Sequence, residues 1–441
     1  MKKRAVSGIA AATLSVIALA GCGTSGAASN TGSGTSTSGS SSANQVVQLS
    51  FWYGIGGQLS NDVQKMVSQF NAANPGIHVT ATYQGSYSGG GPEQQKLLAA
   101  LKAGDPPDLA QMEVNSMPVF SATGKLMALD TQLQQSTVDN PSNFIPGMWA
   151  STQYQGKTYA VPMNRSVPVL YYNETLFHKV GISGPPKTWA DLQADAAKLT
   201  SGSGSGKVYG FGPLVDWWPW EASVWSGGGS ILNSGLSKAD FATPAGEHVL
   251  SIEQQIVKNG NGLVETGPNY WNLMTEDFIH GKIAMDIDSI GSSQEVNTGV
   301  RTSFKWNTAL LPSDATLAVP PGGGNLAIMS GISPAHAAAA FKFVEWFTSP
   351  AQAAEWSELT GYLPVTKAAL SEPGFQTYLK SHPFYNAALK ELADQHPAPP
   401  SPNYLAVLQY VQQSLQGIMD EGKPVDASMK QAQSQANNLL G

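Results

Sequence analysis

VVQLSFW at residues 46–52 opens the stretch that decides the fold. Its β-branched and aromatic residues predict a strand, and apolar residues three to four positions apart over 59–70 predict a helix after it. IHVTATY at residues 77–83 predicts a second strand, a helix ending at Gly104 follows, and DLAQM at 108–112 predicts a third strand. The order β-α-β-α-β predicts the start of a parallel sheet with helices on its faces.

The rest of the chain continues this alternation. Residues 167–172 and 283–287 are apolar runs that predict buried strands, and Thr188 is placed to cap a helix. Ser-Pro pairs at 333–334 and 349–350 predict the starts of two more helices. Without its N-terminal segments the chain keeps roughly 395 residues, a length that predicts two or more domains.

The N-terminus has the pattern of an export signal. Three basic residues at positions 2–4 precede an uncharged, mostly apolar run to Ala20 that is shorter than the roughly 20 residues of a membrane-spanning helix. The sequence Leu19-Ala20-Gly21-Cys22 resembles a bacterial lipobox, which implies cleavage before Cys22 and lipidation of its thiol. We predict a lipoprotein signal peptide at residues 1–22. A simple secretory signal with an incidental cysteine is the alternative.

Residues 23–45 are almost entirely Gly, Ser, Thr, Ala and Asn, and they predict a flexible tether between a lipid anchor on the outside of the membrane and the folded part. Cys22 is the only cysteine, so the protein cannot form an internal disulfide and depends on its core. The net charge of −7 becomes −10 when the three basic residues of the signal are removed (−7 − 3). A negative surface repels nucleic acid, and we expect no nucleic-acid partner.

Several motifs resemble catalytic or cofactor sites but are incomplete. GIGGQL at residues 54–59 has a leucine where a dinucleotide fingerprint needs its third glycine, and the loop at 201–207 lacks the Ser or Thr of a phosphate-binding loop. The seven histidines are scattered, without metal-ligand spacing. Asp286 and Asp288 would share one strand face, whereas glycosidases need carboxylates on both sides of the scissile bond. We predict no catalytic residue, metal or cofactor. An exported carbohydrate-active enzyme and a surface adhesin are remote alternatives.

A tryptophan cluster is the strongest sign of a binding site. Residues 217–225 hold four of the 11 tryptophans. Tryptophan faces suit the C–H faces of sugars and glycerol backbones, although such residues also fill cores. Because Trp217 and Trp218 are adjacent, they point in different directions, and we expect at least one of them near a ligand.

The chain resembles the family 1 extracellular solute-binding proteins of ABC importers, closest to their glycerol-3-phosphate-binding branch. The most specific passage is AEW at 354–356 followed by TGYLPVTKAA at 360–369. Other matching passages are residues 49–52, 70–75, 162–173 and 185–189.

The resemblance implies a type II periplasmic-binding-protein fold, with two α/β lobes and a ligand cleft between them. Each lobe is expected to be a mixed, mainly parallel sheet flanked by helices. We assign residues 46–164 and 326–366 to lobe 1, and residues 165–325 and 367–441 to lobe 2. The implied partners are a small polyol or sugar and the ABC permease subunits, and we expect a monomer.

The resemblance also implies ligand contacts at matching positions. Glu113 is expected to accept hydrogen bonds from ligand hydroxyls. Tyr87 matches an aromatic lid, and Trp218, less surely Trp217, matches the stacking tryptophans. Further polar contacts are expected from Ser166, Ser289, Tyr362 and the backbone N–H groups of Gly322 or Gly323, although Ser166 and Tyr362 could instead only pack between the lobes.

The ligand's charge stays open. The glycerol-phosphate branch has an arginine near its C-terminus, but this chain has neither Lys nor Arg between Lys390 and Lys423. Arg165, beside Ser166, could meet a phosphate instead. If it does, the expected ligand is glycerol-3-phosphate or a glycerophosphodiester, and Arg165→Ala weakens its binding. Otherwise we expect a neutral sugar or oligosaccharide.

Overall fold

The computed structural model describes residues 46–88, 91–267 and 269–441. The predicted signal peptide with Cys22 and the predicted tether at residues 23–45 lie outside the described residues.

A five-stranded mixed sheet is built mainly from the first part of the chain, in the strand order β2-β1-β3-β10-β6. Strand β1 pairs in parallel with β2 and β3, whereas β10 is antiparallel to β3 and β6. The strands are β1 (Val47–Tyr53), β2 (Ile77–Tyr83), β3 (Leu109–Glu113), β6 (Ala160–Ser166) and β10 (Gly322–Ile328). Helices α1 (Gly57–Ala73) and α2 (Pro92–Ala103) connect the first three strands, which confirms the predicted β-α-β-α-β unit.

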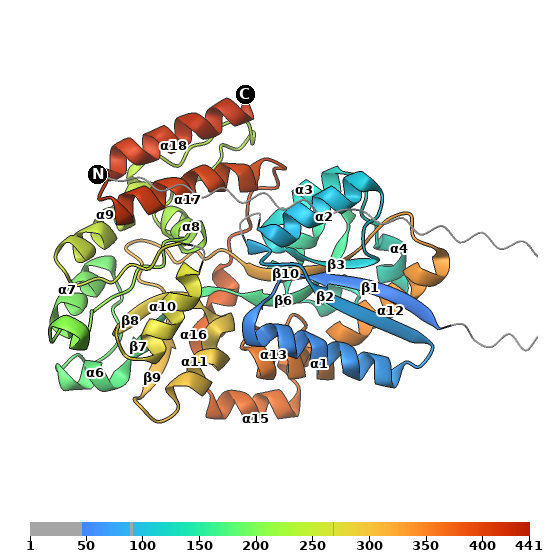
Figure 1. Ribbon diagram of the computed structural model, residues 1–441, viewed down its shortest axis with the longest axis horizontal. Coiled ribbons are helices and arrows are strands. Elements are labelled where there is room, and N and C mark those ends of the chain that lie inside the picture. Colours follow the sequence, from blue (N-terminus) through green and yellow to red (C-terminus); the bar gives the residue numbers. More distant parts are fainter. Residues whose placement is uncertain (1–45, 89–90, 268) are drawn as a thin grey trace, which may run out of the picture. The chain divides into compact units, whose positions relative to one another are not determined.

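Alternation along the strands divides the side chains between the two faces of this sheet. Phe51 of β1 packs with Phe343 of α12 (Pro334–Thr348), their ring centroids 5.5 Å apart, and Phe343 also meets Phe70 of α1. On the other face Trp52 packs with an apolar cluster that includes Leu97 of α2 and residues of α3 (Met117–Ala122). Figure 1 shows α1 and α13 (Pro350–Thr360) on one side of the sheet and α2 and α3 on the other.

A second sheet has the order β8-β7-β9, with β7 (Pro168–Asn173) antiparallel to β8 (Met285–Ser289) and to β9 (Trp306–Ala309). The expected mainly parallel pairing is found here only at the edge, where Tyr209 and Gly212 bridge Ile283 and Asp286 in parallel. The connection from β7 to β8 carries several helices instead of one crossover helix. The βαβ rule that imposes parallel pairing therefore does not apply.

Helices pack around the second sheet, as Figure 1 shows. They are α6 (Glu174–Lys179), α7 (Trp189–Leu199), α10 (Tyr270–Ile279), α11 (Ser293–Val300) and α16 (Tyr385–Glu391).

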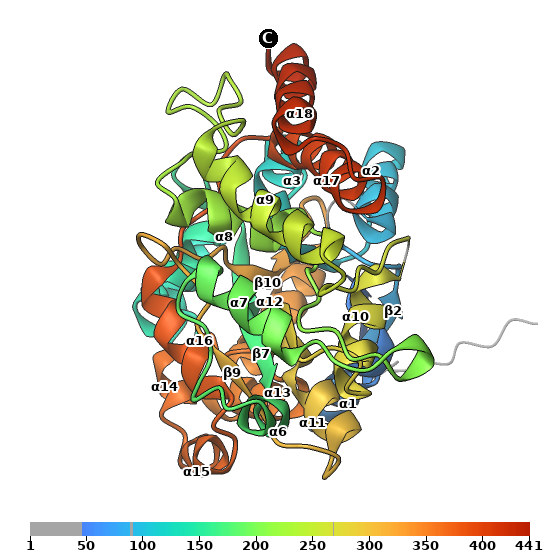
Figure 2. The ribbon, with the colours of Figure 1, turned by 90° about the vertical axis from the view of Figure 1, so that its left-hand side faces the viewer.

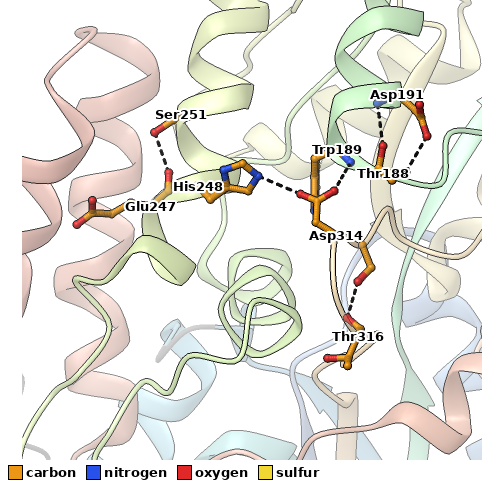
Figure 3. Close-up of polar contacts among 9 residues, drawn as sticks. Thr188, Trp189, Asp191, Glu247, His248, Ser251, Asp314 and Thr316 are labelled. Atoms are coloured by element: carbon orange, nitrogen blue, oxygen red, sulfur yellow. Dashed lines mark hydrogen bonds and ion pairs between the residues drawn. The ribbon is translucent and has the colours of Figure 1, made fainter.

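The start of α7 confirms the predicted cap. Thr188 accepts from the backbone N–H of Asp191, and the Asp191 side chain accepts from the N–H of Thr188, a reciprocal capping box. Asp314 adds a third acceptor, because its Oδ1 lies 3.2 Å from the backbone nitrogen of Trp189 while its Oδ2 pairs with His248 at 3.0 Å (Figure 3).

Four further helices form a separate apolar cluster. They are α8 (Trp217–Ser226), α9 (Pro244–Lys258), α17 (Tyr404–Asp420) and α18 (Val425–Leu440). Figures 1 and 2 both show α9, α17 and α18 lying together. The cluster holds the tryptophans of α8 against the C-terminal helices.

The remaining elements are short. They are η2 (Val114–Ser116), α4 (Asp130–Gln135), η3 (Pro141–Asn143), α5 (Pro146–Trp149), η4 (Ala150–Thr152), β4 (Gln153–Tyr154), β5 (Lys157–Thr158), η5 (Gly204–Gly206), η6 (Ile290–Ser292), α14 (Lys367–Leu370), α15 (Pro373–Ser381) and η7 (Leu392–Asp394). The chain passes between the two sheets at Ser166, and Leu363 donates its N–H to the carbonyl of Arg165 there (2.7 Å). Strand β10 spans the predicted boundary after residue 325, and the lobe boundaries stay a prediction.

Candidate functional site

Strand ends of the five-stranded sheet bring three of the predicted site residues together. Glu113 ends β3 and Ser166 ends β6, while β10 begins between them, with Gly324 opposite Glu113 and Gly322 opposite Ser166. A Cβ atom at Gly322 would lie 2.4 Å from Ser166 Oγ, so the close approach requires glycine. Gly323 has a φ of +95° and faces the carbonyl of Asn164.

Trp218 of α8 lies directly against this strand end. Its Nε1 donates to the carbonyl of Pro321 (3.3 Å), and its Cζ2 would be 2.6 Å from a Cβ at Gly322. Asp216 caps α8 and accepts from the N–H of Trp218 (2.8 Å), which fixes the start of the helix. Trp217 donates its backbone N–H to Gln412 of α17, and the rings of Trp217 and Trp218 both belong to the apolar cluster of α8, α9, α17 and α18.

Two tyrosines complete the predicted set. Tyr87 packs against Gly54, where a Cβ would lie 2.6 Å from the Cβ of Tyr87. Burial, and next the neighbouring Tyr362, raises the pKa of Tyr87, so the two phenols face each other. The Tyr362 ring also covers Gly291, whose N–H donates to Ser289 Oγ (3.0 Å).

These residues form one buried place. They come from both sheets, from α8 and from the loops that hold Tyr87 and Tyr362. Each is no more than 9% exposed, and this holds for Tyr87, Glu113, Ser166, Trp218, Ser289 and Tyr362 alike. The structure therefore brings together Tyr87, Glu113, Ser166, Trp218, Ser289, Tyr362 and the glycines that open β10.

Arg165 has a different role from the one predicted. Its Nη1 donates to the carbonyls of Asn164 (2.9 Å) and Gly324 (2.8 Å). Its Nη2 lies within 2.6–2.8 Å of three acceptors, the Met148 carbonyl, Ser151 Oγ and Asn325 Oδ1. Four of its five N–H groups are thus committed to the protein. Successive strand residues point to opposite faces, so a residue next to Ser166 points away from Ser166's face. An anion-binding Arg165 is corrected to a structural clamp between β6, β10 and α5.

Sequence reasoning missed a second group of residues at the site. The Trp271 ring of α10 lies 5.9 Å from the Trp218 ring, and its Nε1 donates to Asp288 Oδ1 (2.6 Å). Tyr270, the preceding residue, donates its hydroxyl to Asp216. The adjacent Tyr270-Trp271 pair was the only signal available in the sequence.

Acidic side chains also gather here. Glu113 accepts from Gln94 Nε2 (2.9 Å), and Glu221, one turn after Trp218, accepts from the Tyr404 hydroxyl. Burial first, then nearby Glu113, raises the pKa of Glu93 to about 8. Burial also raises the pKa of Glu221 well above its usual value, with Glu113 and Asp216 adding to the shift. Glu221 therefore lies within electrostatic range of both Glu113 and Asp216.

The pair Asp286 and Asp288 occupies one face of β8, as predicted. Asp288 is surrounded by hydrogen-bond donors of the protein itself. Asp288 accepts from Trp271, Thr275, Ser292 and its neighbour's backbone N–H.

Among the described residues there is no group of three His, Cys, Asp or Glu side chains that could hold a metal ion. No helix in the described ranges is both long and apolar enough to cross a membrane.

A small cavity of about 20 Å³ lies between α8, α9 and α17, lined by Trp220, Glu253 and Leu415 among others. That volume holds about one water molecule, too little for a sugar.

Two sheets meet at a buried place that holds aromatic, hydroxyl and carboxyl side chains, and this arrangement is that of a solute-binding protein with the two-lobed periplasmic-binding-protein fold. The chain belongs to the bacterial extracellular solute-binding proteins, whose family model matches residues 65–382. Members of this family bind solutes for ABC importers and are not enzymes.

Individual relatives agree with this assignment. The chain is 28% identical to the sn-glycerol-3-phosphate-binding periplasmic protein UgpB of Escherichia coli K12, over 90% of this chain and 93% of the relative. UgpB from Mycobacterium tuberculosis, solved with glycerophosphocholine, superposes with a TM-score of 0.79 at 26% identity, covering 89% of this chain and 98% of that one. The GacH receptor of Streptomyces glaucescens, solved unliganded and with acarbose, shares the fold with a TM-score of 0.78 at 21% identity, covering 89% and 98%.

Proposed function

We propose that this protein is the lipid-anchored binding component of an ABC importer and captures a small hydroxylated solute outside the membrane. The observation that carries the proposal is the convergence of Trp218, Glu113, Tyr87, Ser289 and Tyr362, from distant parts of the chain, in one buried place. A tryptophan face with a carboxylate and several hydroxyls beside it is suited to a polyol, whose C–H face stacks while its hydroxyls are bound.

The proposed solute class is a sugar or a glycerol-phosphate-derived compound. The E. coli relative is named for sn-glycerol-3-phosphate, and the Mycobacterium tuberculosis structure holds glycerophosphocholine. A neutral sugar is the second candidate, and the contacts of Arg165 favour it. A free phosphate would need a cation, and the guanidinium has four of its five N–H groups engaged with the protein.

A ligand panel tests the proposal. We would measure thermal unfolding and calorimetric binding with glycerol-3-phosphate, glycerophosphodiesters, and mono- and oligosaccharides. A true ligand at 100 times its Kd adds about 2.7 kcal/mol of stability. Trp218→Ala should weaken that ligand at least tenfold, because it removes the stacking surface. The matched control is Tyr154→Ala in the β4–β5 hairpin, an aromatic truncation outside the site. No stabilisation by any member of the panel would refute the proposed function.

The lipid anchor has its own test. Cys22→Ser removes the only thiol, so we expect the variant to be released from membranes or to stay unprocessed. Membrane fractionation with mass determination of the N-terminus reads out both results. Normal processing together with wild-type membrane retention would show that Cys22 is incidental to export.

A further inference from the structure

A row of polar side chains crosses the five-stranded sheet at the site. Gln111 and Glu113 lie two positions apart on β3, and Asn164 and Ser166 lie two positions apart on β6, so each pair shares one face of its strand. Strand β10 runs between them, and its Gly324 lies opposite Glu113 on one side and opposite Asn164 on the other. Directly opposite residues share a face of the sheet, so Gln111 and Asn164 lie on the face that carries Glu113 and Ser166.

The Gln111 side chain crosses β10 to reach Asn164. The two strands are roughly 10 Å apart, because one strand lies between them. A Cβ atom at Gly324 would lie 3.0 Å from Gln111 Cγ and 3.2 Å from its Nε2, so the amide occupies the space that a side chain there would fill. Gln111 Nε2 donates to Asn164 Oδ1 (3.3 Å) and to Met163 Sδ (3.4 Å). Glycine at position 324 therefore lets two buried amides from strands that are not neighbours meet.

The backbone of Gly54 determines which way both amides point. Its N–H donates to Gln111 Oε1 (3.1 Å), and a backbone N–H can only donate, so the nitrogen of Gln111 is left to face Asn164. Asn164 meets that nitrogen with its oxygen, and its own nitrogen, Nδ2, is turned away from Gln111. The carbonyl of Gly54 accepts from the backbone N–H of Tyr87 (3.3 Å), so the same turn also holds an aromatic residue of the site.

Asn164 Nδ2 is a donor that the protein leaves unused. Asn164 is fully buried, yet its Nδ2 has no hydrogen-bond partner among the described residues. A buried N–H group without an acceptor costs free energy unless something else supplies one. Burial raises the pKa of Tyr87, and Tyr362 adds to the rise, whereas the Asn164 side chain lowers it, so the Asn164 amide lies beside the phenols of the site.

Glu113 and Asn164 offer opposite hydrogen-bonding chemistry from either side of Gly324. A carboxylate accepts hydrogen bonds, and an amide NH2 group donates them. Two adjacent hydroxyl groups of one solute can satisfy both side chains, because one hydroxyl donates to Glu113 while the oxygen of the other accepts from Asn164. The glycine between the two side chains leaves the sheet surface open to the solute at this point.

We propose that Asn164 is a further specificity-determining residue, whose Nδ2 donates to a hydroxyl oxygen of the solute, and that Gln111 is the positioning residue that keeps the amide in its donating orientation. The inference rests on the proposed function and narrows its solute class to vicinal diols, with one hydroxyl bound by Glu113 and its neighbour bound by Asn164. Glycerol-derived compounds and sugars both belong to this class.

Deoxy analogues test the contact by calorimetry. The parent solutes are sn-glycerol-3-phosphate, glycerophosphocholine, glucose and maltose, and each parent that binds is compared with analogues that lack one hydroxyl at a time. In the wild-type protein, removal of the hydroxyl that meets Asn164 should weaken binding about tenfold. Asn164→Leu should reduce this difference to less than about threefold, while the loss caused by removing the hydroxyl at Glu113 persists. A variant that only disturbs packing weakens parent and analogue alike, so the ratio of the two affinities isolates the contact.

A second variant tests the positioning role of Gln111. Gln111→Met keeps the length of the side chain but removes the amide that orients Asn164, so we expect the ratio for the same hydroxyl to fall about threefold. This variant also tests the contact if Asn164→Leu does not fold. The control is Asn173→Leu, because Asn173 is a buried asparagine that caps α6 at the other end of β7. It should lower stability in urea and leave every affinity ratio unchanged.

Three outcomes would overturn the inference. They are equal affinity for a bound parent and all its deoxy analogues, ratios that stay the same in Asn164→Leu and Gln111→Met, and binding of none of the four parents. The first two leave the proposed function intact, because the wild-type protein still binds a hydroxylated solute. The third refutes the proposed function as well only if the full ligand panel also fails to stabilise the protein.

Discussion

Arg165 and Glu221 are both completely buried beside the same site, yet the protein gives the two side chains very different numbers of hydrogen bonds. Arg165 donates to backbone carbonyls and an amide oxygen from three elements, and burial lowers its pKa to about 9. Glu221 has one phenol for one oxygen and nothing from the described residues for the other. Four of the five N–H groups of Arg165 are bonded, and only its Nε has no partner among the described residues, whereas Glu221 has one of its two oxygens bonded. Arg165 is therefore tied to the scaffold by many more contacts than Glu221.

The largest predicted effect is the loss of stability when Arg165 is replaced, and it tests whether this side chain belongs to the scaffold. Arg165→Ala leaves buried carbonyls of Asn164, Gly324 and Met148 without donors, and we expect it to lower the free energy of unfolding by about 3–5 kcal/mol. Arg165→Lys should recover only part of this loss, since an ammonium cannot reach acceptors on three elements. Urea denaturation measures both variants.

The competing role of Arg165 has a distinct signature. If Arg165→Ala unfolded at wild-type urea concentrations and lost only the binding of phosphorylated solutes, the arginine would be a ligand group and the contrast with Glu221 would disappear.

A smaller effect concerns Glu253, whose pKa is raised to about 8 by burial alone. The unfolded chain releases this proton near pH 4.5, whereas the folded protein keeps it until about pH 8. Stability therefore falls as pH rises between these values. Glu253→Gln removes the loss, and we expect it to raise the free energy of unfolding by about 1–3 kcal/mol at pH 8, with little change at pH 4.

Urea denaturation at the two pH values distinguishes this cause from packing. A gain of equal size at both pH values would mean that glutamine simply fits the cavity better. A gain confined to pH 8 shows that an uncompensated buried carboxylate is costly in this protein.

The contrast also separates what the sequence could predict from what it could not. Strands β1, β2 and β3 and the cap at Thr188 follow from periodicities and spacings within a few residues. The positions of Tyr87, Glu113 and Ser289 came from matching a family's motifs. For Arg165 the sequence left two alternatives open, an arginine that meets a phosphate and a neutral solute, and its contacts with the protein, which favour the second, depend on the fold and on the alternation of a strand.

The contacts among the acidic and aromatic side chains around α8 could not be predicted from local patterns. Glu221 meets Tyr404 across 183 residues, and Tyr270 meets Asp216 across 54. Only the packing of α8 against α10 and α17 brings these side chains together, and that packing depends on the whole fold. The tryptophan cluster indicated the right helix, but not which of its polar residues would be left without a partner.

The smallest predicted effect is on the exposed ion pair of Asp314 and His248, and it shows how much a solvent-exposed charge contributes to stability. Asp314 is 39% exposed and His248 is 57% exposed, so their pair is screened, in contrast to the buried groups above (Figure 3). Asp314→Asn keeps an acceptor for the Trp189 N–H and removes only the charge, and we expect a loss of about 0–0.5 kcal/mol. Thr188→Ala removes the N-cap of the same helix and should cost about 1 kcal/mol. Urea denaturation of both variants at pH 6, with and without 1 M salt, checks the order.

An Asp314→Asn loss larger than the Thr188→Ala loss would mean that an exposed charge can contribute as much to stability as a buried one in this protein. The contrast between Arg165 and Glu221 could then not be assigned to burial.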